Sequence, residues 1–174
     1  MNTPNKLTIL RVVLIPVFII FMLYEITPFA RFIALGIFVL AFFTDFLDGY
    51  LARKNEQVTN FGKIIDPLAD KILVMAALVC LNVLDVVSPW VTIVILAREF
   101  MVSGIRIAAA SEGTVIAASK WGKVKTIWQF VAICVALLLG CGLITDICMW
   151  IAVALTVISG VDYIMKNSKH LTMD

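Results

Sequence analysis

The chain has 174 residues, of which 62% are hydrophobic and only 15% are charged, and its mean hydropathy is +1.04. This composition excludes an ordinary soluble enzyme and predicts an integral membrane protein. The formal net charge is only +2 and no basic stripe is interleaved with aromatic residues, so we expect no nucleic-acid partner.

Apolar runs long enough to cross a lipid bilayer follow one another along the chain. A spanning helix needs about 20 mostly apolar residues. Runs of this kind occupy about residues 7–24, 29–51, 67–85, 89–110, 123–142 and 144–165. Two longer polar connections remain, at 52–66 and 111–122. We therefore predict an all-α polytopic membrane protein, a six-transmembrane-helix bundle in which residues 1–174 form one domain.

The basic residues are distributed unevenly between the two sides of this bundle. Short cytoplasmic loops collect Lys and Arg. With the N-terminus inside, Arg31 is the one basic residue of the sequence that falls on the outer side. We therefore expect both termini and both polar connections at the cytoplasmic face.

Four aspartates stand beside the apolar runs, in the stretch DFLDGYLARKNEQVTNFGKIIDPLAD. On a helix, Asp45 and Asp48 share a face, and so do Asp66 and Asp70. Four carboxylates in one partly desolvated site would repel one another unless cations cancelled their charge. Oxygen ligands favour Mg²⁺ or Mn²⁺. The pattern predicts a site for two divalent ions, a device typical of phosphoryl displacement.

A structural interpretation competes for the second pair. Asp66 followed by Pro67 is a good helix start, with Asp as the cap and Pro in the first turn. Asp70 would then lie where the helix dipole favours an acid. This alternative does not account for Asp45, which lies inside an apolar run where ionisable residues are costly and usually functional.

Two glycines and an arginine accompany the acids. Gly49 and Gly62 would let a bulky substrate approach the backbone, although helix packing or turn geometry also explains a glycine. Arg53 lies about one turn beyond Gly49, where a guanidinium suits a pyrophosphate. It is also an ordinary basic residue of a cytoplasmic loop.

The complete spacing is Asp45-x2-Asp48-Gly49-x2-Ala52-Arg53-x8-Gly62-x3-Asp66-x3-Asp70. It resembles the signature of the CDP-alcohol phosphotransferases, with all eight motif positions filled at the expected spacing. The resemblance implies a six-helix membrane enzyme, usually a homodimer, that transfers a substituted-phosphate group from a CDP-linked donor to an alcohol and releases CMP.

The resemblance also implies roles for the motif residues. Asp45, Asp48 and Asp66 correspond to metal ligands, and Asp70 to a shared ligand and candidate general base, so that Asp66 and Asp70 lie at the catalytic centre. The remaining positions correspond to the CDP-binding residues, namely Gly49, Ala52, Arg53 and Gly62.

Further runs narrow the resemblance to one bacterial branch of the family. PNKLTILRVVLIP, DPLADK, AREFMVSGIR and GKVKT are similar to the branch that uses CDP-diacylglycerol as donor and glycerol 3-phosphate as acceptor. The resemblance implies phospholipid biosynthesis at the bacterial cytoplasmic membrane, with the active site facing the cytoplasm.

A phosphorylated acceptor would need positive charge beside the metals. Arg98, Arg106 and Lys123 are the candidates for binding its phosphate, and family members place basic residues around an anion site. Lys120 and Lys125 are weaker candidates. Arg98 with Glu99 is alternatively a structural ion pair.

Three other functions remain open at this point. The same chemistry with another acceptor, such as serine, an inositol phosphate or phosphatidylglycerol, fits the aspartates equally well, although serine would not need the basic cluster. A small cation or proton transporter would also place carboxylates in the membrane, but usually near its midplane on broken helices. A helical scaffold would not explain the spaced acids.

Overall fold

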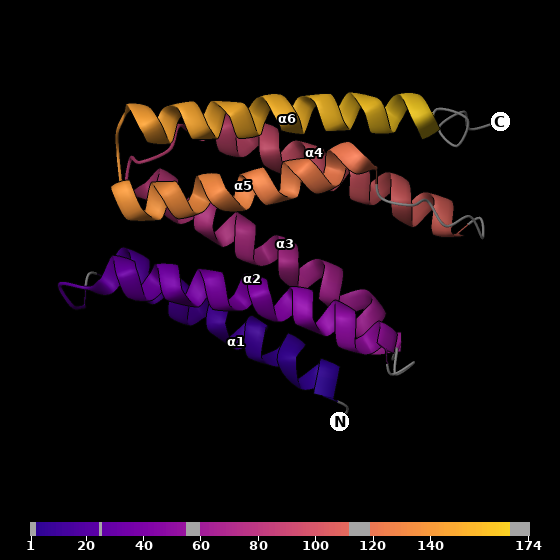
Figure 1. The fold of residues 1–174 in the computed structure, drawn as a ribbon, viewed down its shortest axis with the longest axis horizontal. Coiled ribbons are helices and arrows are strands. Elements are labelled where there is room, and N and C mark those ends of the chain that lie inside the picture. The colour runs from indigo at the N-terminus through magenta and orange to yellow at the C-terminus, as the bar shows by residue number, and fades with distance from the viewer. Residues whose placement is uncertain (1–2, 25, 55–59, 112–118, 168–174) are drawn as a thin grey trace. The chain divides into compact units, whose positions relative to one another are not determined.

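The computed structural model describes the backbone of residues 3–24, 26–54, 60–111 and 119–167. Within these ranges the chain forms six α-helices and no strand (Figure 1). The helices are α1 (Thr3–Leu23), α2 (Ala30–Lys54), α3 (Asn60–Val83), α4 (Pro89–Ser111), α5 (Lys120–Leu139) and α6 (Leu143–Asn167). Side chains are described for most of these residues, whereas 3–9, 45–54, 60–70, 108, 110–111, 120 and 167 are described by their backbone alone.

Each predicted apolar run lies mostly within one helix, which confirms the all-α fold class. Residues Trp121–Leu139 and Leu143–Lys166 are long and apolar enough to cross a membrane, yet only 33% and 39% of their apolar windows are buried. Shorter apolar helical stretches are found at Leu10–Leu23, Ala30–Thr44 and Lys71–Val83. Such exposed apolar surface is unfavourable in water and suits contact with lipid.

The predicted connection at residues 52–66 is wrong in extent. α2 continues to Lys54 and α3 already begins at Asn60, so most of that stretch is helical. The prediction used Pro67 as the start of the third helix, because Pro is common in a first turn. Polar residues at the ends of membrane helices extend them beyond their apolar part, which hydropathy alone does not detect.

The chain divides into two compact units, residues 1–84 and 85–174. In the first unit, α1 packs against both α2 and α3. The rings of Phe18 and Phe38 meet with centroids 6.1 Å apart, and the fully buried Ala34 and Ala77 allow close helix packing. The single-domain organisation stays a prediction.

In the second unit, α6 packs against both α4 and α5. The indole Nε1 of Trp128 donates a hydrogen bond to the carbonyl of Cys148, 3.1 Å away, which ties α5 to α6. α5 is capped at its start by Ser119, whose side chain accepts from the Gly122 N–H at 3.1 Å. It ends at Leu139, and the next residue, Gly140, has a φ of 68°, which favours glycine.

Candidate active site

The two aspartate pairs lie on neighbouring helices of the first unit. Asp45 and Asp48 belong to α2, and they precede its last residue by nine and six positions, about 14 and 9 Å along the axis. Asp66 and Asp70 belong to α3, and they follow its first residue by six and ten positions, about 9 and 15 Å. The pairs therefore lie at similar depths on two contacting helices.

The capping interpretation of Asp66 is wrong. α3 begins at Asn60, so Asp66 lies in its second turn, where an N-cap has no role. Pro67 is also interior, and its missing N–H leaves the carbonyl of Lys63 without its usual helical donor. Asp70 is ten residues from the helix start, beyond the first turn in which the dipole favours an acid.

The predicted CDP-binding positions follow the same helices. Gly49, Ala52 and Arg53 occupy the last two turns of α2, and Gly62 is the third residue of α3. The side chains of these residues and of the four aspartates lie outside the described part of the structure. Their roles in binding stay predictions, and what the structure adds is their placement at one end of the unit (Figure 1).

α1 brings a buried positive charge to this region. Arg11 is only 1% exposed, and it follows the first residue of α1 by eight positions, about 12 Å along the axis. The N-terminus of α1 lies at the end of the unit where α2 finishes and α3 begins (Figure 1). Arg11 is therefore at about the depth of the aspartates.

The second unit carries four basic residues that we call the basic cluster, namely Arg98 and Arg106 on α4 and Lys123 and Lys125 on α5. Arg98 lies 13% exposed, with Nη1 at 3.5 Å from Glu99 Oε1. A Cβ at Gly160 of α6 would lie only 3.2 Å from its Cγ, so the arginine stem packs against that glycine. Its Nη2 is 3.9 Å from where a Cβ at Gly122 would stand, which places the guanidinium beside the first turn of α5.

The other two predicted basic residues are more exposed. The Cζ of Arg106 lies 5.6 Å from the ring centroid of Tyr163, within reach of a cation–π interaction. Lys123, in the first turns of α5, is exposed. Arg98 and Arg106 are close enough for their positive charges to interact. The structure thus brings two of these residues together and leaves the third at the surface.

Glu99 provides one negative charge in this cluster. Its Oε1 accepts from Nζ of Lys125 as well as from Arg98, so the ion pair that the sequence left open is present. Besides Glu99, α4 carries Arg98 and Arg106, and α5 carries Lys123 and Lys125. Positive charge that is partly removed from water favours an anionic ligand, and guanidinium groups suit phosphate.

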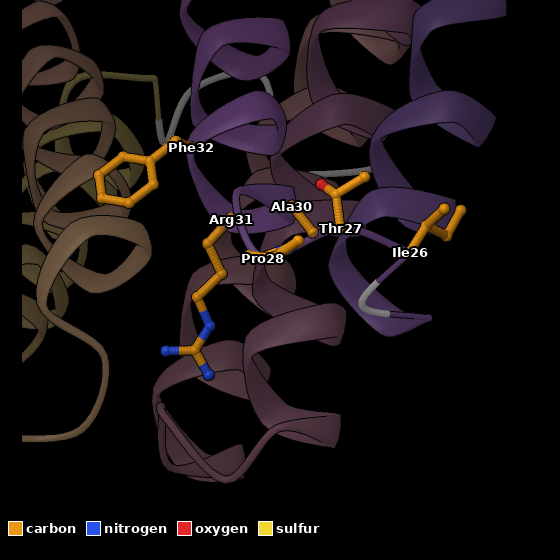
Figure 2. Close-up of a pocket in the computed structure, with 6 residues that line it drawn as sticks. All are labelled: Ile26, Thr27, Pro28, Ala30, Arg31 and Phe32. Atoms are coloured by element: carbon orange, nitrogen blue, oxygen red, sulfur yellow. The ribbon is translucent and has the colours of Figure 1, made fainter.

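A hollow of about 440 Å³ lies elsewhere, at the connection that precedes α2 and the first residues of that helix (Figure 2). Its lining includes Thr27, Pro28 and Arg31. Asp45 is 15 residues further along α2 than Ala30, about 22 Å away, so this hollow is remote from the aspartates.

Comparison with known proteins shows the family of this chain. The model of the CDP-alcohol phosphatidyltransferase family matches residues 1–158, which include all four aspartates and the basic cluster. This chain belongs to that family. The prediction made from the signature is confirmed.

Individual CDP-alcohol phosphatidyltransferases are similar to this chain over almost its whole length. CDP-diacylglycerol–glycerol-3-phosphate 3-phosphatidyltransferase of Bacillus subtilis strain 168 is 44% identical over 187 residues, covering 98% of this chain and 97% of the relative. The Rickettsia bellii protein of the same name is 42% identical over 176 residues, with 97% of each chain covered. A probable phosphatidylglycerophosphate synthase of Mycobacterium tuberculosis is 42% identical, covering 98% of this chain and 83% of the relative.

CDP-alcohol phosphatidyltransferases are polytopic membrane proteins that use a divalent metal. The donor set on α2 and α3 fits such an ion, because four carboxylates on contacting helices are hard oxygen ligands. Among the residues whose side chains are described, no group of three or more His, Cys, Asp or Glu could hold a metal.

Sequence reasoning underestimated Lys125. Its side chain is 2% exposed and is among the largest that are fully buried. A signal was present, since Lys125 and Gln129 are spaced i, i+4 in an apolar run and therefore share a helix face. Gln129 is also buried, at 3% exposure.

Proposed function

We propose that this CDP-alcohol phosphatidyltransferase transfers the phosphatidyl group of CDP-diacylglycerol to glycerol 3-phosphate, giving phosphatidylglycerol phosphate and CMP in phospholipid biosynthesis. The main support is the set of relatives, 42–44% identical over nearly the whole chain, that carry this activity in their names. The basic cluster around Arg98 supports a phosphorylated acceptor over a neutral one.

The aspartates divide the chemical work in this proposal. Asp45, Asp48, Asp66 and Asp70 hold two divalent ions, Mg²⁺ or Mn²⁺, which would supply charge stabilisation to the donor pyrophosphate. Asp70 takes the proton of the acceptor hydroxyl. The hydroxyl oxygen attacks the phosphorus of the phosphatidyl group, a new P–O bond forms, and the bond to CMP breaks so that CMP leaves with the electron pair.

Different residues bind the lipid donor and the water-soluble acceptor in this proposal. Gly49, Ala52, Arg53 and Gly62 bind the CDP part of the donor, whose acyl chains remain in the bilayer. Arg98, Arg106 and Lys123 bind the phosphate of the acceptor, which arrives from water. The protein works as a homodimer, as the resemblance implies.

The activity is tested by measuring CMP release from CDP-diacylglycerol by the purified protein in detergent with Mg²⁺. Glycerol 3-phosphate, serine, an inositol phosphate and phosphatidylglycerol are compared as acceptors, and a parallel arm contains EDTA. We expect release with glycerol 3-phosphate alone, and its loss in EDTA, because without cations the clustered carboxylates would repel the pyrophosphate. CMP release with another acceptor would overturn the proposed acceptor. CMP release in EDTA would overturn the proposed metal site.

All six helices cross the cytoplasmic membrane in this proposal, with both termini and the active site at the cytoplasmic face. The distribution of basic residues supports this orientation, because Lys and Arg collect on the cytoplasmic side and Arg31 is the one basic residue of the sequence that would lie on the outer side. Cys141 then faces the outside. It lies exposed in the turn between α5 and α6, whereas Cys80 is buried and Cys134 and Cys148 are partly buried.

A membrane-impermeant maleimide tests this orientation. We expect it to label the protein in right-side-out membrane vesicles and the Cys141→Ser variant to remain unlabelled, because Cys141 is the exposed cysteine. Mass spectrometry of the labelled peptide provides the measurement, and inside-out vesicles are the control. Stronger labelling of Cys141 in the inside-out vesicles would reverse the proposed topology.

A further inference from the structure

A partly buried ion pair connects α4 to α5 beside the basic cluster. Lys125 Nζ contacts Glu99 Oε1, and the two residues are 26 positions apart in sequence. The lysine side chain is 2% exposed and the glutamate side chain 20%. The buried ammonium group depends on this carboxylate, because removing Glu99 would leave the charge of Lys125 without compensation. Lys125 therefore holds the Glu99 carboxylate in place.

The same carboxylate oxygen also meets the arginine of the cluster. Nη1 of Arg98 lies 3.5 Å from Glu99 Oε1. The stem of Arg98 is confined on another side by Gly160, where a Cβ would stand only 3.2 Å from Cγ. Its Nη2 is directed toward the start of α5. Arg98 thus packs against α6, lies beside the start of α5 and makes a polar contact with Glu99.

We propose that Glu99 is a positioning residue for the acceptor. It orients the guanidinium of Arg98 toward the phosphate of glycerol 3-phosphate and, as a carboxylate, does not itself bind that phosphate. Lys125 serves this arrangement by anchoring Glu99 and is not a phosphate ligand. The inference rests on the proposed function, because it concerns the acceptor site of the same reaction.

The charge of Glu99 makes the direction of the effect diagnostic. A carboxylate beside an anion site repels the anion, so simple removal of its charge would strengthen acceptor binding. A carboxylate that orients an arginine has the opposite effect, because the freed guanidinium loses the geometry needed for bidentate contact with phosphate. The two roles therefore move the acceptor KM in opposite directions.

The decisive variant is Glu99→Gln, assayed for CMP release while glycerol 3-phosphate and CDP-diacylglycerol are each varied. We expect the KM for glycerol 3-phosphate to rise about tenfold, the scale of one charge-assisted hydrogen bond. The KM for CDP-diacylglycerol and kcat should change by less than about twofold. An acceptor KM that is unchanged or lowered overturns the proposal, and so does an equal rise in both KM values.

Asp162→Asn is the matched control. Asp162 is also a carboxylate with a 20% exposed side chain and a lysine partner, Lys166, at 2.6 Å, but that pair lies within α6. We expect its kinetic constants to equal those of the wild type. A rise in acceptor KM as large as that of Glu99→Gln would show a general effect of carboxylate loss and would also overturn the proposal.

Glu99→Asp covers the case in which Glu99→Gln leaves Lys125 unpaired and does not fold. This variant keeps the negative charge and withdraws the carboxylate by one methylene group. An orienting role predicts a raised acceptor KM, whereas a purely electrostatic role predicts no change, which would overturn the proposal. Wild-type protein is assayed alongside. Its failure to use glycerol 3-phosphate would overturn the proposed function, whereas an active wild type with unaffected variants would overturn only the role of Glu99.

Discussion

Replacing Asp45 by asparagine is expected to lower kcat about a thousandfold or more. The change keeps the size of the side chain and removes the charge that we propose binds a divalent ion. Stabilisation of several kcal/mol by metal ions, at about 1.4 kcal/mol per tenfold in rate, gives an effect of this size. CMP release with saturating substrates, measured over a range of Mg²⁺ concentrations, provides the test.

Asp85→Asn is the control for this substitution. Asp85 lies between α3 and α4 with a φ of 55°, a conformation that asparagine tolerates well. Its carbonyl accepts from Cys141 Sγ at 3.4 Å, and this backbone contact does not depend on the side chain. We expect wild-type activity from Asp85→Asn. Undiminished kcat in a folded Asp45→Asn variant would contradict the proposed metal site.

Replacing Arg98 by glutamine is expected to raise the KM for glycerol 3-phosphate about 100-fold, while the KM for CDP-diacylglycerol stays near that of the wild type. Hydrogen bonds to charged groups contribute about 1.5–3 kcal/mol each, and the arginine fork makes two of them with a phosphate. Arg98→Lys should recover only part of the loss, because an ammonium group keeps the charge without the planar geometry. The readout is the initial rate of CMP release.

Arg31→Gln serves as the control arginine. Arg31 is exposed and lies near the start of α2, beside the hollow in Figure 2 and remote from the aspartates. Its loss should leave both KM values unchanged. If Arg98→Gln bound glycerol 3-phosphate as well as the wild type does, the acceptor phosphate would have to be placed elsewhere.

The sequence predicted the helices better than their ends. Apolar runs of about 20 residues leave the backbone few ways to satisfy its polar groups in lipid other than a helix. The start of α3 was missed because Pro67 looked like a first-turn residue, whereas the helix begins at Asn60. That difference removed the capping interpretation of Asp66, and the metal-binding role of the aspartates stays a prediction.

Part of the candidate site could also be predicted from the sequence alone. Once the helices are given, the spacing of Asp45 with Asp48 and of Asp66 with Asp70 places each pair on one face, because helical periodicity is local. The sequence also determined the family, since the signature is a set of short spacings within one stretch.

Only the tertiary structure decided how the basic residues are used. Glu99 and Lys125 are 26 residues apart and lie on different helices, and Arg98 packs against a glycine of a third helix. Nothing in the local sequence specifies such contacts, because they depend on which helix faces meet. The sequence by itself therefore determined the helices, the paired acids and the family, whereas helix packing decided that Lys125 is buried, that Glu99 links it to Arg98, and that Lys123 remains exposed.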